Sequence, residues 1–124
     1  MRLLVYLALG GMAGTFARYG LQGLIQSPGG TFPWGTLVVN LLGALLLGFL
    51  MRYLLGSGLA GPDLRAALTI GFCGAFTTMS TFSFETVALL QDGEYGRATL
   101  YLLSSVGGSL AAVFAGMGIA SRML

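Results

Sequence analysis

The chain has 124 residues, of which 56% are hydrophobic and only 8% are charged, and its net charge is +2. An ordinary soluble domain has about 25% charged residues, so this composition argues against a water-soluble fold. Histidine and lysine are absent and Cys73 is the single cysteine, which argues against zinc sites, disulfide frameworks and histidine-based acid–base chemistry. We therefore expect an integral membrane protein that is not an enzyme and does not bind nucleic acid.

Four apolar stretches follow one another along the chain, separated by short polar or glycine-rich segments. They cover residues 3–25, 35–55, 66–90 and 98–121. A helix that spans a lipid bilayer needs about 20 mainly apolar residues. We therefore predict an all-α membrane protein in which residues 1–124 form a single transmembrane domain of four helices. The short connections make neighbouring helices antiparallel.

The first two stretches each contain one conspicuous polar residue. Arg18 lies near the end of the first stretch, where its long side chain can reach toward the membrane interface. Asn40 lies near the start of the second, where its amide can either donate hydrogen bonds to an anion or link neighbouring helices. From these residues alone, we expect Arg18 to reach the interface and Asn40 to link helices.

The third stretch contains a dense cluster of hydroxyl side chains: Thr77, Thr78, Ser80, Thr81 and Ser83. Hydroxyls can bond to backbone groups and weaken the helix, and Gly74 nearby has a low helix propensity. A break near Gly74 would free carbonyl groups to coordinate a cation. The alternative is a continuous helix whose hydroxyls bond to its own carbonyls, and the residues alone leave both readings open. Glu85 follows this cluster. Three roles are open for it: a vestibule residue, a proton-coupled site or the partner of an arginine.

In the fourth stretch Tyr101, Ser105 and Ser109 recur every four residues. At about 100° per residue each step drifts by only about 40°, so the three side chains form one polar stripe along a helix. Such a stripe can line an ion path, and serines also occur where helices pack closely. The spacing alone does not decide between these two roles.

The arginines are distributed unevenly between the two ends of the predicted bundle. Four spans place both termini and the second connection on one side, together with Arg2, Arg52, Arg65 and Arg122. Arg97 lies on the other side, with Arg18 toward the same end. The positive-inside rule therefore favours cytoplasmic termini only mildly. We expect that the chain can insert in both orientations.

Three segments together resemble the Fluc (CrcB-like) fluoride channels: residues 10–19 (GGMAGTFARY), 35–43 (GTLVVNLLG) and 71–83 (GFCGAFTTMSTFS). Each segment is a weak signal alone, but their order, spacing and the four-span length make the combination specific. The resemblance implies an antiparallel homodimer of dual topology in the inner (plasma) membrane. It also implies two fluoride pathways at the subunit interface, and passive export that relieves fluoride toxicity.

The resemblance also implies roles for individual residues. Asn40 matches the pore asparagine and Phe82 the second of two pore phenylalanines, whereas Met79 stands where most members have the first. Gly74 and Thr77 match the positions whose backbone carbonyls hold a central, structural sodium ion. The full set of expected fluoride-pathway residues is Arg18, Thr36, Asn40, Met79, Ser80, Thr81, Phe82, Glu85, Tyr101, Ser105 and Ser109.

The chemistry of fluoride agrees with this set. Fluoride is small and strongly hydrated, so a pathway must replace its water with donors that do not trap it. Neutral amides and hydroxyls suit this task, and an aromatic ring such as Phe82 presents a positive edge to an anion. Met79 is adaptable and has a weakly positive methyl group. We therefore expect conduction to survive without the first phenylalanine.

Two alternative functions remain to be weighed. A small multidrug-type, proton-coupled exporter has similar architecture but needs an embedded acid in its first helix, and residues 3–25 contain none. Glu85 could replace it only from the third helix. A non-conducting structural membrane protein would explain the many glycines but not the aligned polar groups.

Overall fold

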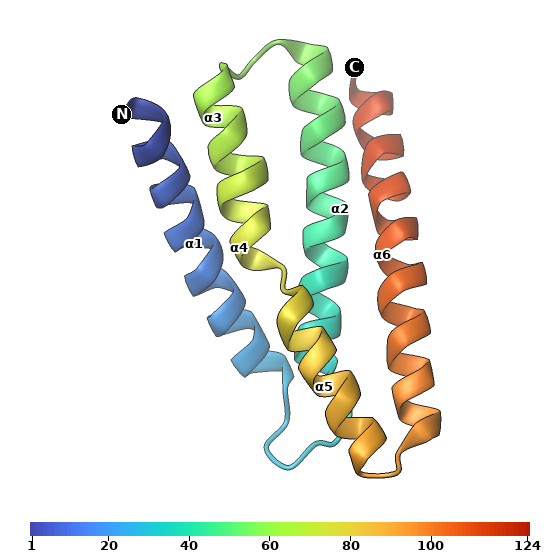
Figure 1. The fold of residues 1–124 in the computed structure, drawn as a ribbon. Coiled ribbons are helices and arrows are strands. Elements are labelled where there is room, and N and C mark those ends of the chain that lie inside the picture. Colours follow the sequence, from blue (N-terminus) through green and yellow to red (C-terminus); the bar gives the residue numbers. More distant parts are fainter.

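The computed structural model describes residues 1–124, and its regular structure is entirely helical. The chain runs up and down, with both termini at the same end (Figure 1). The elements in chain order are α1 (Arg2–Ile25), α2 (Trp34–Ser57), α3 (Pro62–Ala66), the π-helix η1 (Ala67–Cys73), α4 (Gly74–Phe76), α5 (Met79–Gln91) and α6 (Tyr95–Met123). The prediction of an all-α fold is confirmed.

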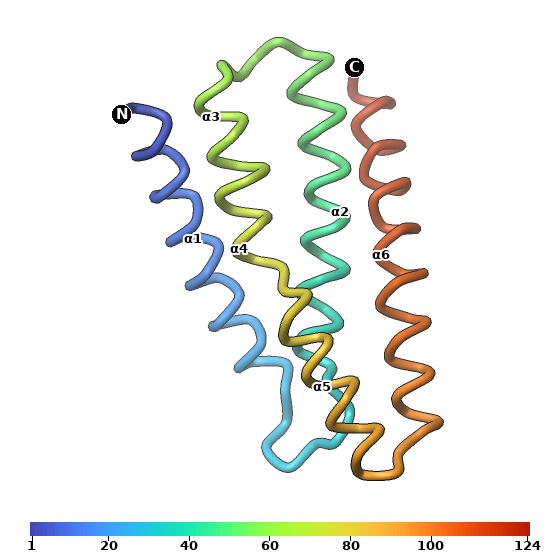
Figure 2. Tube along the Cα trace, viewed as in Figure 1, coloured from blue at the N-terminus to red at the C-terminus, as the bar shows by residue number.

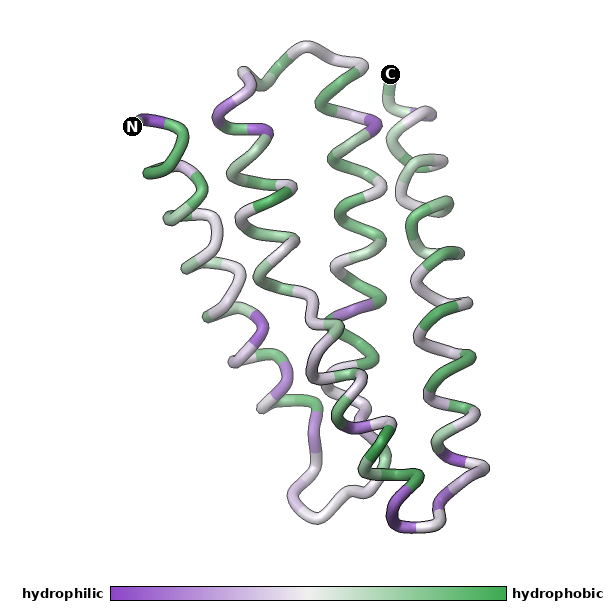
Figure 3. Tube along the Cα trace, viewed as in Figure 1, coloured by the Kyte–Doolittle hydropathy of each residue, from purple (hydrophilic) through white to green (hydrophobic).

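Three helical segments are long and apolar enough to cross a membrane: α2, the run from α3 through α5, and α6. Figure 3 shows hydrophobic residues along these segments and hydrophilic residues mainly toward the helix ends. Although α1 has 24 residues, it is not among the three because Arg18, Gln22 and several glycines reduce its apolar content. A fourth span therefore stays a prediction.

The third segment is broken between α4 and α5, where the trace steps sideways (Figure 2). Thr77 and Thr78 have extended backbones, with φ/ψ of −94°/158° and −150°/112°. Gly74 itself stays helical, with φ/ψ of −64°/−35°. The break therefore begins three residues after Gly74, because the Thr78 side chain caps α5 by accepting a hydrogen bond from the Thr81 N–H.

Helix pairs approach closely at glycines. α1 packs along η1 and α4, and α2 packs along α6. A Cβ atom at Gly14 would collide with the carbonyl of Phe72, and one at Gly116 would collide with the carbonyl of Leu45. These contacts agree with the packing role that small residues have in membrane proteins. Close backbone contact brings the polar side chains of different helices within hydrogen-bonding distance.

Candidate functional site

The broken segment is held by Asn40 of α2. The Asn40 Oδ1 accepts a hydrogen bond from the Thr78 N–H at 2.8 Å, and Nδ2 donates to the Thr78 carbonyl at 3.2 Å. One amide therefore satisfies both backbone groups of a non-helical residue. The expected helix-linking role of Asn40 is confirmed. Its amide nitrogen carries a second N–H that these bonds do not use.

The break leaves two backbone carbonyls without their helical partners. In a continuous helix, the N–H of Thr78 would donate to Gly74 and that of Thr81 to Thr77. Instead, Thr78 donates to Asn40 and Thr81 donates to the Thr78 hydroxyl. Gly74 also has no neighbouring atoms in the space where a Cβ would lie. Carbonyl oxygens of this kind are the ligands that replace the hydration shell of an alkali cation, so these two positions fit a sodium site.

Arg18 makes a hydrogen bond inside the protein, and its reach toward the membrane interface stays a prediction. Its Nε donates to the carbonyl of Ala75 at 2.9 Å, and the residue is partly buried. The reason is the packing of α1 against α4, which brings a carbonyl next to the break within reach of the guanidinium. The arginine therefore links α1 to the last turn before the break.

A cavity of about 450 Å³, here called the central cavity, lies between α2, the broken segment and α6. Its 16 lining residues include seven that the resemblance assigns to the fluoride pathway or the sodium site: Asn40, Gly74, Thr77, Met79, Phe82, Ser105 and Ser109. The Ser105 hydroxyl is buried and has no hydrogen-bond partner. Because buried polar atoms are nearly always paired, a bound water or ion is the natural partner for this hydroxyl.

Two of the predicted residues form an edge-on aromatic pair next to this cavity. Phe82 and Tyr101 have ring centroids 5.1 Å apart at 61°, an edge-on arrangement. Phe32, from the connection between α1 and α2, packs on the other side of Tyr101 at 5.6 Å. The Tyr101 side chain is fully buried, and its hydroxyl lacks a hydrogen-bond partner. The stripe on α6 therefore faces the interior at Tyr101 and Ser105.

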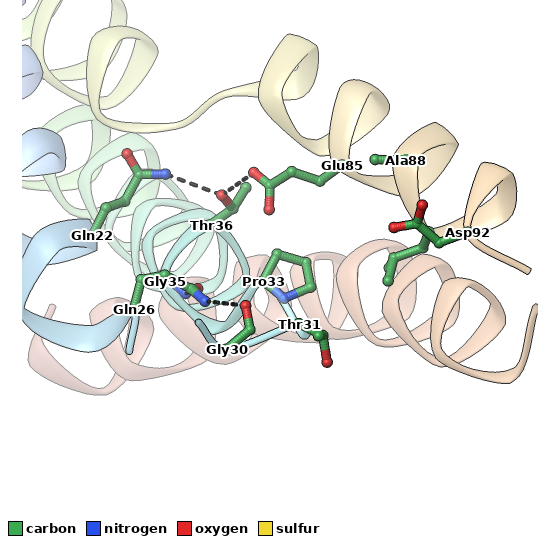
Figure 4. Close-up of a pocket in the computed structure, with 11 residues that line it drawn as sticks. Gln22, Gln26, Gly30, Thr31, Pro33, Gly35, Thr36, Glu85, Ala88 and Asp92 are labelled. Carbon is green, nitrogen blue, oxygen red and sulfur yellow. Dashed lines mark hydrogen bonds between the residues drawn. The ribbon is translucent and has the colours of Figure 1, made fainter. Parts of the chain in front are cut away.

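A second cavity of about 370 Å³, here called the end cavity, lies where α1, α2 and α5 meet. Figure 4 shows Gln22, Thr36 and Glu85 in line along it. The Gln22 Nε2 donates to the Thr36 hydroxyl at 3.1 Å, and that hydroxyl donates to Glu85 Oε1 at 2.6 Å. Of the three roles open for Glu85, the arginine partnership is wrong, because its hydrogen-bond partner is Thr36.

Comparison with known proteins decides the family. Residues 5–117 match the family described as "CrcB-like protein, Camphor Resistance (CrcB)". The chain belongs to the CrcB-like family. A relative named "Fluoride-specific ion channel FluC" from Geobacter sulfurreducens is 46% identical over 125 residues, covering 100% of both chains.

Two further relatives of the same name support this membership. The protein from Geobacter sp. strain M21 is 48% identical over 124 residues, covering 99% of this chain and 100% of the relative. The protein from Thermus thermophilus is 48% identical over 107 residues, covering 86% of this chain and 85% of the relative. This CrcB-like chain is thus a multi-pass inner-membrane protein of a channel family, and the prediction that it is not an enzyme is confirmed.

The hydroxyl cluster predicted from the sequence of this CrcB-like chain lies around the start of α5. The Thr78 hydroxyl donates to the Thr81 hydroxyl at 2.9 Å and lies 3.3 Å from that of Ser80. The Ser83 hydroxyl bonds back to the Met79 carbonyl, as expected for a hydroxyl within a helix. Met79 is 71% exposed in the single chain. Ser80 is exposed as well, so this cluster lies on an open face beside the central cavity.

Two residues of the site were missed from the sequence, Gln22 and Phe32. Gln22 lies four residues after Arg18, on the same face of α1, and this spacing was a readable signal. Phe32 lies in a connection rich in proline and glycine. No local pattern there predicts contact with a tyrosine 69 residues later, which only the fold brings near.

Proposed function

We propose that this protein is a fluoride-selective ion channel through which fluoride leaves the cytoplasm passively, which reduces fluoride toxicity. Relatives named fluoride-specific ion channels match the chain over its full length. The observation that carries the proposal is a pair of buried hydroxyls without partners, those of Tyr101 and Ser105. They are uncharged donors suited to replacing the water of a small anion without trapping it.

The proposed pathway connects the two cavities. At the end cavity it passes Thr36 and Glu85, with Arg18 toward the break, and continues past the Tyr101 hydroxyl to the edge of Phe82. At the central cavity it is lined by Asn40, Met79, Ser105 and Ser109, with Ser80 and Thr81 at the start of α5. The unused N–H of Asn40 and the positive edge of Phe82 offer fluoride contacts without a fixed positive charge.

An antiparallel homodimer with four spans per chain, α1 included, completes this arrangement. In the single chain Gly74 and Met79 are exposed beside the central cavity, and apolar side chains such as Ile70 surround them. Exposed polar groups within a bilayer are costly unless protein or water covers them, which supports an interaction surface at this face. A second copy of opposite orientation would cover this face and give two pathways related by symmetry.

A sodium ion at the centre of that dimer is the proposed structural ion. The carbonyls of Gly74 and Thr77 from both subunits would hold it, since both have lost their helical donors at the break. When bound, the ion supplies fixed positive charge that favours an anion in the neighbouring pathways. It is held by the fold and is not transported.

Fluoride and chloride efflux from liposomes that contain the purified protein tests this function. Ion-selective electrodes follow each anion in the absence of a proton gradient, with protein-free liposomes as the control. We expect fast fluoride efflux and no chloride efflux. Equal chloride efflux, or a requirement for a proton gradient, would contradict the proposal. The proton-coupled exporter has no support from the three relatives described above, each of which is named as a channel.

A further inference from the structure

Gln22 is a polar residue of the end cavity to which neither the resemblance nor the relatives' names give a role. It lies in the last turns of α1 and is partly buried. Its amide is directed at the Thr36 hydroxyl, which in turn is directed at Glu85 (Figure 4). Three separate elements, α1, α2 and α5, therefore meet through one short chain of hydrogen bonds.

The direction of this chain follows from the groups in it. An amide nitrogen only donates, and an ionised carboxylate only accepts. Thr36 accepts from Gln22 through a lone pair of its oxygen, which leaves its single hydroxyl proton to be donated to Glu85. The Thr36–Glu85 bond is short, at 2.6 Å, as expected for a hydroxyl bonded to a carboxylate. Thr36 is also 96% buried, at 4% exposure, so water does not compete for its oxygen.

We propose that Gln22 is a positioning residue of the ion pathway, which orients the Thr36 hydroxyl toward Glu85 and so holds the Glu85 carboxylate at the cavity wall. This inference rests on the proposed fluoride channel. Without Gln22, the Thr36 hydroxyl rotates freely and the carboxylate loses its fixed donor. The negative charge then swings into the end cavity, where it opposes an incoming anion.

Fluoride efflux of Gln22→Met measures this role, with Gln91→Met as the matched control. Gln91 is exposed at the end of α5 and lines neither cavity. Losing one neutral hydrogen bond that orients the pathway should slow fluoride efflux by about three- to tenfold. The control should conduct like the unmodified protein. Unchanged efflux in Gln22→Met would overturn the inference while the channel function stands, and a non-conducting unmodified protein would overturn both.

The combination with Thr36→Val separates positioning from a packing role. If Gln22 acts through Thr36, adding Gln22→Met to Thr36→Val slows efflux no further. Multiplied losses would overturn the inference. Because Thr36→Val alone can abolish conduction, a second measurement follows the ¹³C NMR signal of the Glu85 carboxyl. The chain has two glutamates, so the Glu94→Gln variant identifies which signal belongs to Glu85. Gln22→Met should shift this signal and Gln91→Met should not. An unshifted signal in Gln22→Met would overturn the inference.

Discussion

Asn40 braces the break through its bonds to Thr78, and we propose that it also lines the pathway; two substitutions separate these roles. Its amide makes two hydrogen bonds to Thr78, one accepted and one donated. Asn40→Ala removes both, whereas Asn40→Asp keeps the bond from the Thr78 N–H and loses only the donated one. We expect Asn40→Ala to report the structural role through a loss of stability, and Asn40→Asp to report the pathway role because its added charge slows conduction.

The magnitudes follow from the two bonds. A partly buried polar group left without its partner costs about 1–3 kcal/mol, so Asn40→Ala should lose about 2–6 kcal/mol of unfolding free energy. Asn40→Asp leaves one carbonyl unpaired, which costs about 1–3 kcal/mol, and also places a carboxylate against that carbonyl in a partly buried site, which adds to the loss. A negative charge about 4 Å from fluoride, at an effective dielectric constant of about 20, adds about 4 kcal/mol to the barrier. That corresponds to fluoride efflux about a thousandfold slower.

Thermal unfolding in detergent and fluoride efflux from liposomes measure the two effects side by side. Gln91→Glu is the control for added charge, because it makes the same amide-to-acid change at an exposed end of α5. It should conduct like the unmodified protein. Efflux of Asn40→Asp within tenfold of the unmodified protein would refute the pathway role. Stability of Asn40→Ala equal to that of the unmodified protein would refute the bracing of the break.

Three further predictions concern packing, the pathway and topology. Gly10→Ala should lower the unfolding free energy by about 1–3 kcal/mol, because the added Cβ meets the backbone of η1. Gly11→Ala places its Cβ in open space and should be tolerated. Thermal unfolding of both variants measures the difference. Met79→Phe should conduct fluoride as the unmodified protein does in the efflux assay, and loss of chloride exclusion in either would contradict the pathway. Leu59→Cys, made in a Cys73→Ala background, places a single thiol in the exposed connection after α2. If insertion is dual, a membrane-impermeant thiol reagent should label about half of the protein molecules. Complete labelling or none would reject dual topology.

The helical segments could be predicted because long apolar runs are a direct signature of helices in a membrane protein. Their ends were less predictable. The third segment begins at Pro62, four residues before the predicted start, because proline is favoured in the first turn of a helix. Its first turns contain Asp63 and Arg65, so apolar content alone does not detect them. The π-helical turns of η1 carry no composition signal at all.

The site could be predicted in its residue types but not in its contacts. The hydroxyl cluster left a break and a continuous helix both open, and the position of the break depends on Asn40 and Thr78, which are 38 residues apart. Likewise Arg18 finds its carbonyl partner 57 residues away, through the close packing of α1. Such pairings depend on which helix faces lie together, and periodicity within one helix does not encode that.

The reversal potential of fluoride current in a planar bilayer tests passive, selective conduction most directly. With a tenfold fluoride gradient and equal chloride on both sides, the current through a fluoride-selective channel should reverse at about 59 mV, the value for an ion of single charge. The sign of this potential should be that of the fluoride equilibrium potential. Imposing a chloride gradient in either direction should leave that potential unchanged. A reversal potential near zero, or one that follows chloride, would contradict fluoride-selective conduction.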